Sequence, residues 1–449
     1  MGKPVNSDGQ RIQELCKKYS MYTWNVQKDV DPMPVARTDG LYFWDYDGNR
    51  YMDLTSQLVN VNIGFNHPKV VKAIQEQAET MPFIAPKYAY KARAELSRLL
   101  IEEIAPDNMG KVLFSLAGAD ANEFALRIAK AYTGREKIFS KYWDYHGSTY
   151  GAAMMNGEAI KPSPSPEIGG FVKFFAPFPF HEEIPFPSEQ ALSAYYLNNL
   201  RKHLIFEGPD RVAAIFIEPV TGSNGVIIPP DGYLQGLRSL CDEFGILLVF
   251  DEVMMGFGRT GHWFAADYFG VKPDIITFAK GVTCGYAPLG GVLIDKKIAD
   301  YFETKRLSCG LTYNAHPLGC AAAIATINVY KEEKILENTQ RLSKVFAKGL
   351  DEIKAKHPQV GDVRCIGLMG GIEFVKNAKT REPLVPYGIT STSPVMDFFV
   401  NAMKGKGFSL FGRGSIAVIA PPLIIKEAEL LDALRAVDES LTLLENSPS

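Results

Sequence analysis

The sequence predicts an α/β fold, with a large domain built on a mainly parallel sheet covered by helices on both faces, and a smaller α/β domain. Between residues 111 and 297, short apolar segments alternate with segments of helical periodicity. The apolar segments are continuous rather than alternating, which is typical of strands buried on both faces. Strands and helices in alternation form parallel sheets, because each helix returns the chain to the edge from which the strand began.

Six apolar segments of this region are predicted strands: Lys111–Ser115, Lys137–Lys141, Ala213–Pro219, Leu247–Asp251, Asp274–Phe278 and Gly291–Asp295. Helical periodicity lies between several of them, over Ala121–Ala131 and Gly232–Phe244. In parallel α/β sheets, ligands bind beyond the carboxyl ends of the strands. Polar residues at those ends are therefore candidates for a functional site, and Glu218, Asp251 and Lys280 all fall there.

Two segments outside these strands have distinct patterns. Residues 40–53 alternate like a β-hairpin that turns at Asp47-Gly48. Residues 152–190 are rich in Pro and Phe, and their aromatic content argues against a disordered linker. We expect this second segment to be an ordered excursion over the surface of the large domain.

The two ends of the chain are expected to form the smaller domain together. Residues 315–356 are predicted to be largely helical, and residues 360–449 mix strand signals with a final amphipathic helix, Lys426–Leu444. The expected division is an N-terminal segment of the small domain, a large domain and a C-terminal small domain, at residues 1–75, 76–330 and 331–449.

Composition limits the partners of the protein. The 449 residues are 46% hydrophobic and 22% charged, which is ordinary for a globular protein. The formal charge of −3 gives no electrostatic reason to expect nucleic acid or an anionic membrane as a partner. No apolar run approaches the roughly 18 residues that would indicate a membrane span. We therefore expect a small-molecule partner, with no nucleic acid and no membrane.

The N-terminus and the cysteines predict a cytoplasmic protein. The first eight residues are polar and lack the apolar stretch of a signal peptide. The six cysteines show no C-x-x-C spacing, which favours reduced thiols over disulfides or zinc. The seven histidines lack ligand spacing too, so no metal site is expected.

Lys280 and Asp251 are the two residues that most directly suggest a chemistry. Each ends a predicted strand, and a lysine amine can form a Schiff base with the aldehyde of pyridoxal 5'-phosphate (PLP). A carboxylate can hold the ring nitrogen of PLP protonated, so that the ring accepts electrons. A surface lysine is the ordinary alternative for Lys280, and metal ligation is the alternative for Asp251-Glu252, although no third ligand at suitable spacing supports it.

Two further segments could complete a PLP site. Gly118-Ala119 lies in a small-residue turn between a strand and a helix, where free backbone N–H groups can bind a phosphate. The alternative is an ordinary tight turn. Tyr145-His146-Gly147 places an aromatic ring just beyond a strand, where it could stack on a flat heteroaromatic ring. A core tyrosine is the alternative there.

A different class of function is suggested by Gly256–Gly261, which reads G-x-G-x-x-G soon after a strand. That pattern is typical of dinucleotide-binding oxidoreductases that use NAD. Asp251 and Glu252 stand just upstream and would repel a pyrophosphate, and no isolated acid follows at the end of the next strand. The NAD-dependent oxidoreductase is therefore a remote alternative.

Taken together, these segments resemble the class III (ω-) aminotransferases, which have PLP fold type I. The resemblance covers nearly the whole chain. Beyond the segments above, it includes Ile217–Gly225, Leu248–Gly261, Gly310–Pro317 and Pro421–Ile425. It implies a seven-stranded sheet in the large domain, PLP as the cofactor, and a homodimer with shared active sites, possibly a tetramer.

The resemblance also implies roles for single residues. Lys280 would bind PLP covalently and move the proton, while Asp251 would pair with the ring nitrogen. Tyr145 and Val253 would sandwich the ring. The remaining cofactor-binding positions would be Gly118 and Ala119 at the phosphate, His146 and Gly147 beside Tyr145, Glu218 near the cofactor face, where it can pair with an arginine, and Thr312 at the phosphate of the partner subunit's cofactor. Many members of the family have Gly-Ser in place of Gly118-Ala119, so one hydroxyl contact to the phosphate is missing here.

The substrate follows less directly from the resemblance. The family transfers amino groups from ω-amino acids or primary amines, such as taurine, β-alanine, 4-aminobutyrate or arylalkylamines, to pyruvate or 2-oxoglutarate. Arg413 matches the arginine that binds the acid group, although its register is about two residues short of the common pattern. Trp24, Leu58 and Val59 match segments that line the substrate pocket. The sequence around Trp24 and Asn60 is similar to that of taurine-type transaminases.

These observations predict a PLP-dependent transaminase that works by a ping-pong mechanism. It would move an amino group from an ω-amino acid or amine to a 2-oxo acid. An aminomutase or a decarboxylating transaminase on the same scaffold is the alternative, because such enzymes share the lysine and the aspartate. The sequence leaves open which donor and which acceptor the enzyme uses.

Overall fold

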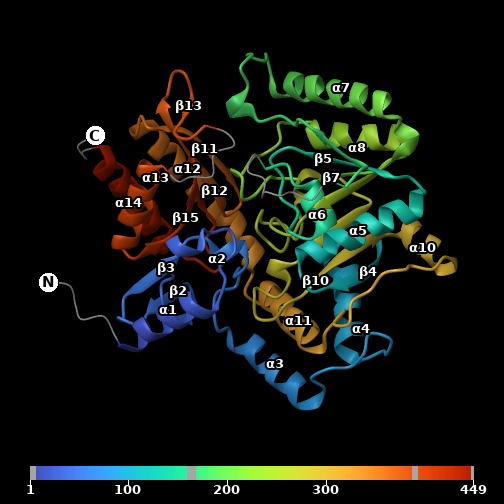
Figure 1. The fold of residues 1–449 in the computed structure, drawn as a ribbon, viewed down its shortest axis with the longest axis horizontal. Coiled ribbons are helices and arrows are strands. Elements are labelled where there is room, and N and C mark those ends of the chain that lie inside the picture. Colours follow the sequence, from blue (N-terminus) through green and yellow to red (C-terminus); the bar gives the residue numbers. More distant parts are fainter. Residues whose placement is uncertain (1–6, 159–167, 387–392, 446–449) are drawn as a thin grey trace.

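A computed structural model describes residues 7–158, 168–386 and 393–445 (Figure 1). Its centre is a seven-stranded sheet with the order β4-β10-β9-β8-β7-β5-β6. The strands are β4 (Met109–Ser115), β5 (Lys137–Lys141), β6 (Phe171–Phe174), β7 (Val212–Ile217), β8 (Leu247–Asp251), β9 (Ile275–Phe278) and β10 (Gly290–Asp295). All pairings are parallel except those of β10, which runs antiparallel to β4 and β9. The predicted α/β fold with a mainly parallel sheet is confirmed.

Both faces of this sheet are buried, as the continuous apolar strands predict. Successive residues of β7 and β8 point to opposite faces: Phe216 and Val249 pack in one core cluster, while Ile217 and Phe250 pack in the other. The first cluster includes residues of α5 and α10, and the second includes residues of α7 and α8. The strands therefore need no polar face, and their polar residues are confined to their ends.

The helices of the large domain are α3 (Pro68–Thr80), α4 (Lys91–Leu99), α5 (Gly118–Thr133), α6 (Tyr150–Met155), α7 (Glu189–Glu207), α8 (Tyr233–Phe244), α9 (Ala265–Phe269), α10 (Lys296–Thr304) and α11 (Pro317–Glu332). Shorter turns are the 3-10 segments η1 (Gln27–Asp29), η3 (Pro179–His181), η4 (Pro209–Arg211) and η5 (Lys280–Val282), and the π segment η2 (Leu100–Ile104). Among the described residues, no helix is long and apolar enough to cross a membrane.

The segment 152–190 differs from its prediction. Its residues 159–167 lie outside the described part of the chain, but Phe171–Phe174 forms β6, the edge strand beside β5. The expectation of a surface excursion is therefore wrong for this strand. Three of its four residues are only partly buried, so it lacks the continuous apolar signal of the inner strands.

The two ends of the chain meet in a second structural region, seen as the blue and red ribbons of Figure 1. Its elements are α1 (Ser7–Tyr19), β1 (Val35–Asp39), β2 (Tyr42–Asp45), β3 (Arg50–Asp53), α2 (Ser56–Val59), α12 (Ile335–Lys356), β11 (Val360–Ile366), β12 (Met369–Asn377), β13 (Glu382–Pro383), α13 (Pro394–Gly405), β14 (Phe408–Ser409), β15 (Phe411–Arg413), β16 (Ile416–Ile419) and α14 (Glu427–Glu445). The predicted hairpin is β2–β3, and β3 pairs in parallel with β14. This pairing joins the two ends, whereas the exact domain boundaries stay a prediction.

Candidate active site

A cavity of about 640 Å³ lies at the carboxyl ends of the parallel strands. Its volume is in the range of small-molecule and cofactor sites. Eleven of the residues proposed from the sequence line it: Trp24, Leu58, Gly118, Ala119, Tyr145, His146, Gly147, Glu218, Asp251, Val253 and Lys280. Residues separated by more than two hundred positions are thus brought to one place, as the strand-end rule for α/β sheets requires.

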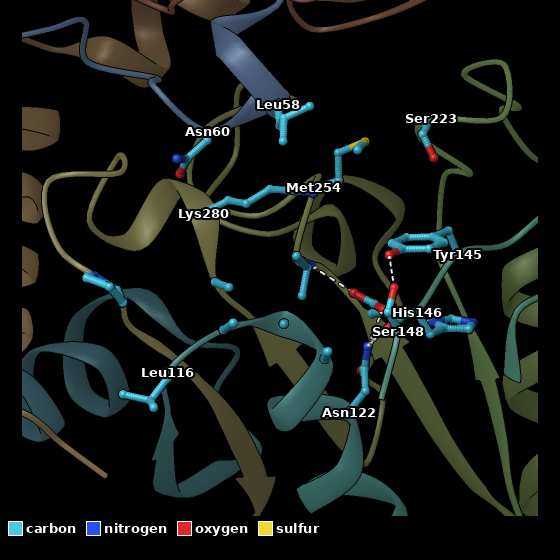
Figure 2. Close-up of a pocket in the computed structure, with 18 of the residues that line it drawn as sticks. Leu58, Asn60, Leu116, Asn122, Tyr145, His146, Ser148, Ser223, Met254 and Lys280 are labelled. Atoms are coloured by element: carbon cyan, nitrogen blue, oxygen red, sulfur yellow. Dashed lines mark hydrogen bonds and ion pairs between the residues drawn. The ribbon is translucent and has the colours of Figure 1, made fainter. Parts of the chain in front are cut away.

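Lys280 is delivered to the cavity by β9. Its side chain extends across the cavity from one side, while Tyr145 and His146 lie on the other (Figure 2). The backbone of Lys280 has φ +41, a conformation that non-glycine residues adopt rarely and that is found at functional sites. Among the described residues, no hydrogen bond or ion pair of Nζ is found. Burial lowers the pKa of this amine, while the charges of Asp251 and Glu218 oppose the shift.

Asp251 is the last residue of β8, and three donors hold its carboxylate. Oδ2 accepts hydrogen bonds from Asn122 Nδ2 at 2.7 Å and from His146 Nδ1 at 2.8 Å. Oδ1 accepts from the backbone N–H of Val253 at 3.0 Å. A carboxylate has about four acceptor positions, so these donors leave one for a further donor. The side chain is 4% exposed, which leaves the cavity as the place for that donor.

Asn122 is a member of this site that the sequence did not reveal. It lies in the first turns of α5, and its Oδ1 accepts a hydrogen bond from Thr277 Oγ1 at 2.8 Å. Its Nδ2 also donates to the backbone oxygen of His146 at 2.8 Å. One amide therefore ties β9, Asp251 and the Tyr145–Gly147 segment together. The only signal was a polar residue in a buried helix face, since Asn122 is 1% exposed.

The N-terminus of α5 opens onto the cavity. The carboxylate of Asp120 accepts hydrogen bonds from the N–H groups of Leu116 and Ala117, and the first two residues of the helix, Gly118 and Ala119, line the cavity. A Cβ atom at Gly118 would lie 2.8 Å from a methyl group of Val253. A Cβ at Gly147 would lie 2.5 Å from Cβ of Ala119. Both glycines thus allow a close approach of backbone that a phosphate site needs.

Glu218 follows β7 and lines the cavity with its side chain almost fully buried. Oε1 accepts the N–H of Tyr145 at 2.8 Å, and Oε2 accepts the N–H of Gly222 at 2.9 Å. Burial first, and then the charges of Asp144 and Asp251, raise the pKa of Glu218 well above its usual value. The expected pairing with an arginine is not found among the described residues, where the two oxygens accept from backbone N–H groups.

Three residues proposed from the sequence do not line the cavity. Val59 is buried in a cluster with Val220 and Met255, because positive φ values at residues 56, 57 and 59 turn Leu58 toward the cavity instead. The expectation that Val59 lines the pocket is therefore wrong. Thr312 is exposed and outside the cavity lining. Arg413, on β15, is also outside the lining, and its guanidinium pairs with Glu158 at 3.1 Å.

The Gly256–Gly261 segment has no helix N-terminus to offer a pyrophosphate. It folds back on itself, with the N–H of Phe257 bonded to the oxygen of Trp263 at 2.6 Å, and only the five-residue α9 follows. Its Arg259 is fully buried and donates to the backbone oxygens of Leu368 and Pro421. The segment therefore connects distant parts of the chain through hydrogen bonds. Because it offers no helix N-terminus to a pyrophosphate, the dinucleotide-binding alternative is wrong.

Glu252, the neighbour of Asp251, points away from the cavity. Its two oxygens accept the N–H groups of Ala265 and Ala266 at 2.6 and 2.7 Å, at the start of α9. Burial raises the pKa of Glu252 to about 8. The role of Glu252 is therefore to connect the end of β8 to α9, and not to bind a metal together with Asp251.

Comparisons with known proteins show which family this chain is similar to. The family Aminotransferase class-III matches residues 23–441. Taurine:2-oxoglutarate aminotransferase from Bifidobacterium kashiwanohense, solved with PLP and glutamate, has a TM-score of 0.93 and 43% identity, over 99% of this chain and 100% of that one. Putrescine–pyruvate aminotransferase of Pseudomonas aeruginosa is 32% identical over 419 residues, which are 91% of this chain and 89% of the relative. A probable γ-aminobutyrate transaminase 4 of Oryza sativa subsp. japonica is 30% identical over 436 residues, covering 92% and 89%.

Proposed function

The chain belongs to the class-III aminotransferases, which are PLP-dependent transferases, and from this premise we propose that the cavity performs amino transfer with Lys280 and Asp251 as catalytic residues. The donor is an ω-amino acid or a primary amine, and the acceptor is a 2-oxo acid. The single observation that supports these roles best is that one cavity holds a buried amine, with no partner among the described residues, and a carboxylate with one acceptor position left by its described donors.

The residues of the cavity fit PLP in three places. Lys280 supplies the amine for the aldehyde, and Asp251 supplies the acceptor for a protonated ring nitrogen. The N–H groups of Gly118 and Ala119 supply donors for the phosphate at the positive end of α5. Gly118 and Gly147 allow the segments around this site to pack closely, because a Cβ at either position would collide with Val253 or Ala119. Tyr145 and Val253 both line the cavity, as a sandwich of the ring requires.

Each of these residues has a definite task in the reaction. When bound, PLP supplies an electron sink for the carbon from which the proton leaves. Asp251 keeps a proton on the ring nitrogen, because its carboxylate is held by three donors and needs a fourth. Lys280 Nζ is the base that moves the proton, since burial lowers the pKa of the amine and so favours its neutral, proton-accepting form. Leu58 and Trp24 line the cavity with apolar surface and would limit access of water once a partner subunit covers them.

The part of the cavity lining proposed to recognise the substrate consists of apolar and uncharged polar side chains. Leu58 and Met254 are joined there by Asn60 and Ser223 (Figure 2). Trp24 also lines the cavity. Among the described residues that line this cavity, Lys280 is the only lysine or arginine. We assign recognition of the acid group to Arg413, which would have to leave Glu158 to reach the substrate. The 43% identity to a taurine:2-oxoglutarate aminotransferase favours a taurine-like donor and 2-oxoglutarate as acceptor.

The enzyme is proposed to be a homodimer with shared active sites, and two such dimers would make the tetramer that the family resemblance allows. Trp24 and Leu58 line the cavity and are nevertheless 78% and 64% exposed, which leaves an apolar rim for a second copy to cover. Thr312 is followed by Tyr313, which is half-exposed and packs on Phe83. In the dimer, Thr312 would reach the phosphate of the partner's cofactor.

A cytoplasmic location is part of the same proposal. All six cysteines are free, and three of them are buried. Reduced thiols are typical of cytoplasmic proteins, where glutathione and thioredoxin keep them so. Fractionation of the cells that produce the protein would test this.

A donor and acceptor panel tests the proposed reaction. Purified enzyme is incubated with taurine, β-alanine, 4-aminobutyrate, putrescine or an arylalkylamine, each with 2-oxoglutarate or pyruvate, and glutamate or alanine is measured. We expect glutamate from the ω-amino acids. Consumption of donor without glutamate or alanine would favour aminomutase or decarboxylation chemistry instead. In Arg413→Met, KM for 2-oxoglutarate should rise by roughly tenfold or more, and Lys426→Met is the control for loss of one exposed charge.

A further inference from the structure

Behind Asp251, a chain of buried polar side chains leads away from the cavity through His146 and Asp144 to Lys141. His146 Nδ1 lies 2.8 Å from Asp251 Oδ2, and its Nε2 lies 3.8 Å from Asp144 Oδ2. Lys141 Nζ lies 3.1 Å from Asp144 Oδ1. Each of the four side chains belongs to a residue less than a tenth exposed. Buried charges are costly unless they are paired, and here they are paired in alternation.

The carboxylate of Asp144 is fixed from several sides. Oδ1 accepts a hydrogen bond from Thr221 Oγ1 at 2.6 Å, and Oδ2 accepts the N–H of Glu218 at 2.8 Å. Lys141 Nζ donates to Thr221 Oγ1 at 2.8 Å, which closes a small ring of contacts with Asp144. Asp144 is fully buried. Its negative charge therefore has a defined position relative to the segment that carries Tyr145 and His146.

The imidazole of His146 lies between the two aspartates. Because a carboxylate only accepts, Nδ1 carries the hydrogen that it donates to Asp251. Nε2 is buried and has no hydrogen-bond partner, so the nearby Asp144 is the charge that faces it. The ring is thus held at Nδ1 by Asp251, and the field of Asp144 acts on its far side.

We propose that Asp144, with its charge balanced by Lys141, is a positioning residue for Asp251 and acts on it through the ring of His146. The pair fixes both the orientation of the Asp251 carboxylate and the electrostatic potential at the ring nitrogen of the cofactor. Neither residue touches the cavity. The inference rests on the proposed role of Asp251, and it adds two residues to the machinery that no sequence motif indicated.

The charge of Asp144 also shifts the pKa values of two neighbouring groups. On the cavity side, the pKa of Glu218 is raised by burial and next by the charge of Asp144. On the α8 side, burial and then Asp144 raise the pKa of the Tyr233 hydroxyl. Removing the charge of Asp144 should therefore change the potential in the cavity without removing any side chain that contacts the cofactor.

The test is a pH titration of the visible absorbance of the holoenzyme. In Asp144→Asn, the apparent pKa of that absorbance should fall by about half a pH unit, because a negative charge that favours the protonated form is lost. In Lys141→Met, the charge of Asp144 is no longer balanced, and the apparent pKa should rise. Asp274→Asn, a buried aspartate at the opposite edge of the sheet, is the control and should leave the titration unchanged while lowering Tm.

The outcomes separate this inference from the proposed function. Titrations of Asp144→Asn and Lys141→Met that coincide with the wild type, or that shift in the same direction, would overturn the inference. If Asp144→Asn does not fold, the sign of the Lys141→Met shift decides alone. A wild type that has no visible absorbance with PLP would overturn the roles of Lys280 and Asp251, whereas a normal wild type with unshifted variants overturns only the role of Asp144.

Discussion

The parallel strands of the seven-stranded sheet begin along one side of it, here called the amino edge, and end along the other, here called the carboxyl edge. Buried aspartates lie at both edges, but their partners differ. At the amino edge, Asp274 precedes β9 and is paired with Arg238 at 2.7 Å and Lys297 at 2.5 Å, and it accepts the N–H of Leu248. At the carboxyl edge, Asp251 has only one side-chain partner that could carry charge, His146, and the amine of Lys280 has none among the described residues. Pairing with a lysine and an arginine indicates a structural role for Asp274, whereas a buried carboxylate that pairs with neither indicates room for a cationic group of a cofactor.

Substitution of Asp251 should produce the largest effect and separate the two edges most clearly. In Asp251→Asn, the rate of half-transamination should fall by several orders of magnitude, because a ring nitrogen without a carboxylate is a poor electron sink. Stopped-flow absorbance with a good donor measures this rate. An unchanged rate would show that Asp251 has no role at the ring nitrogen.

The matched change at the amino edge, Asp274→Asn, should affect stability and not chemistry. Loss of one partner of a buried ion pair costs about 3 kcal/mol, and Arg238 would keep its pairing with the exposed Asp242 but lose the buried one. Urea unfolding measures the loss, and kcat per folded molecule should stay at the wild-type value. A large fall in kcat at full folding would mean that the two edges are not separate in function.

A smaller effect is expected at the phosphate site. In Gly118→Ala, the new Cβ would lie 2.8 Å from a Val253 methyl group, so the turn or Val253 must shift. Overpacking of this kind costs roughly 1–3 kcal/mol, and Kd for PLP should rise by about tenfold. Fluorescence titration of the apoenzyme measures Kd. Gly405→Ala is the control, because a Cβ there meets no atom within 4 Å.

No effect on catalysis is expected at Glu252, which lies beside Asp251 but outside the cavity lining; the expected change is in stability alone. Because its pKa is about 8 in the folded protein and about 4.5 when unfolded, the folded state binds more protons between these values. Its contribution to stability is therefore lost as pH rises from about 4.5 to 8. Glu252→Gln should remove this part of the pH dependence. The Tm of the variant minus the Tm of the wild type should therefore increase from pH 5 to pH 8. A constant difference in Tm would contradict the assignment.

The strands and their terminal residues could be predicted from the sequence because one physical rule governs both. A strand buried on two faces must be apolar throughout, so a polar residue at its end is conspicuous. Lys280, Asp251 and Glu218 were found in this way, and all three line one cavity. The turn at Gly118 was found because a phosphate needs small residues at a helix start.

The residues that sequence reasoning missed act through tertiary contacts without a local pattern. Asn122 and Asp144 are polar residues whose importance lies in partners more than seventy positions away. Val59 was misplaced because its positive φ cannot be anticipated for a β-branched residue. The β6 strand was missed because an edge strand is only partly buried. Arg413 and Thr312 lie outside the cavity, and their roles stay predictions.

The central claim is that Lys280, whose buried amine lies at the carboxyl edge, forms the covalent bond to the cofactor. Holoenzyme is treated with borohydride, digested, and examined by mass spectrometry for lysines that carry reduced pyridoxyl phosphate. We predict label on Lys280, and neither label nor visible absorbance in folded Lys280→Ala. Label on a different lysine, or a Lys280→Ala variant that keeps the visible absorbance of the wild type, would contradict the account.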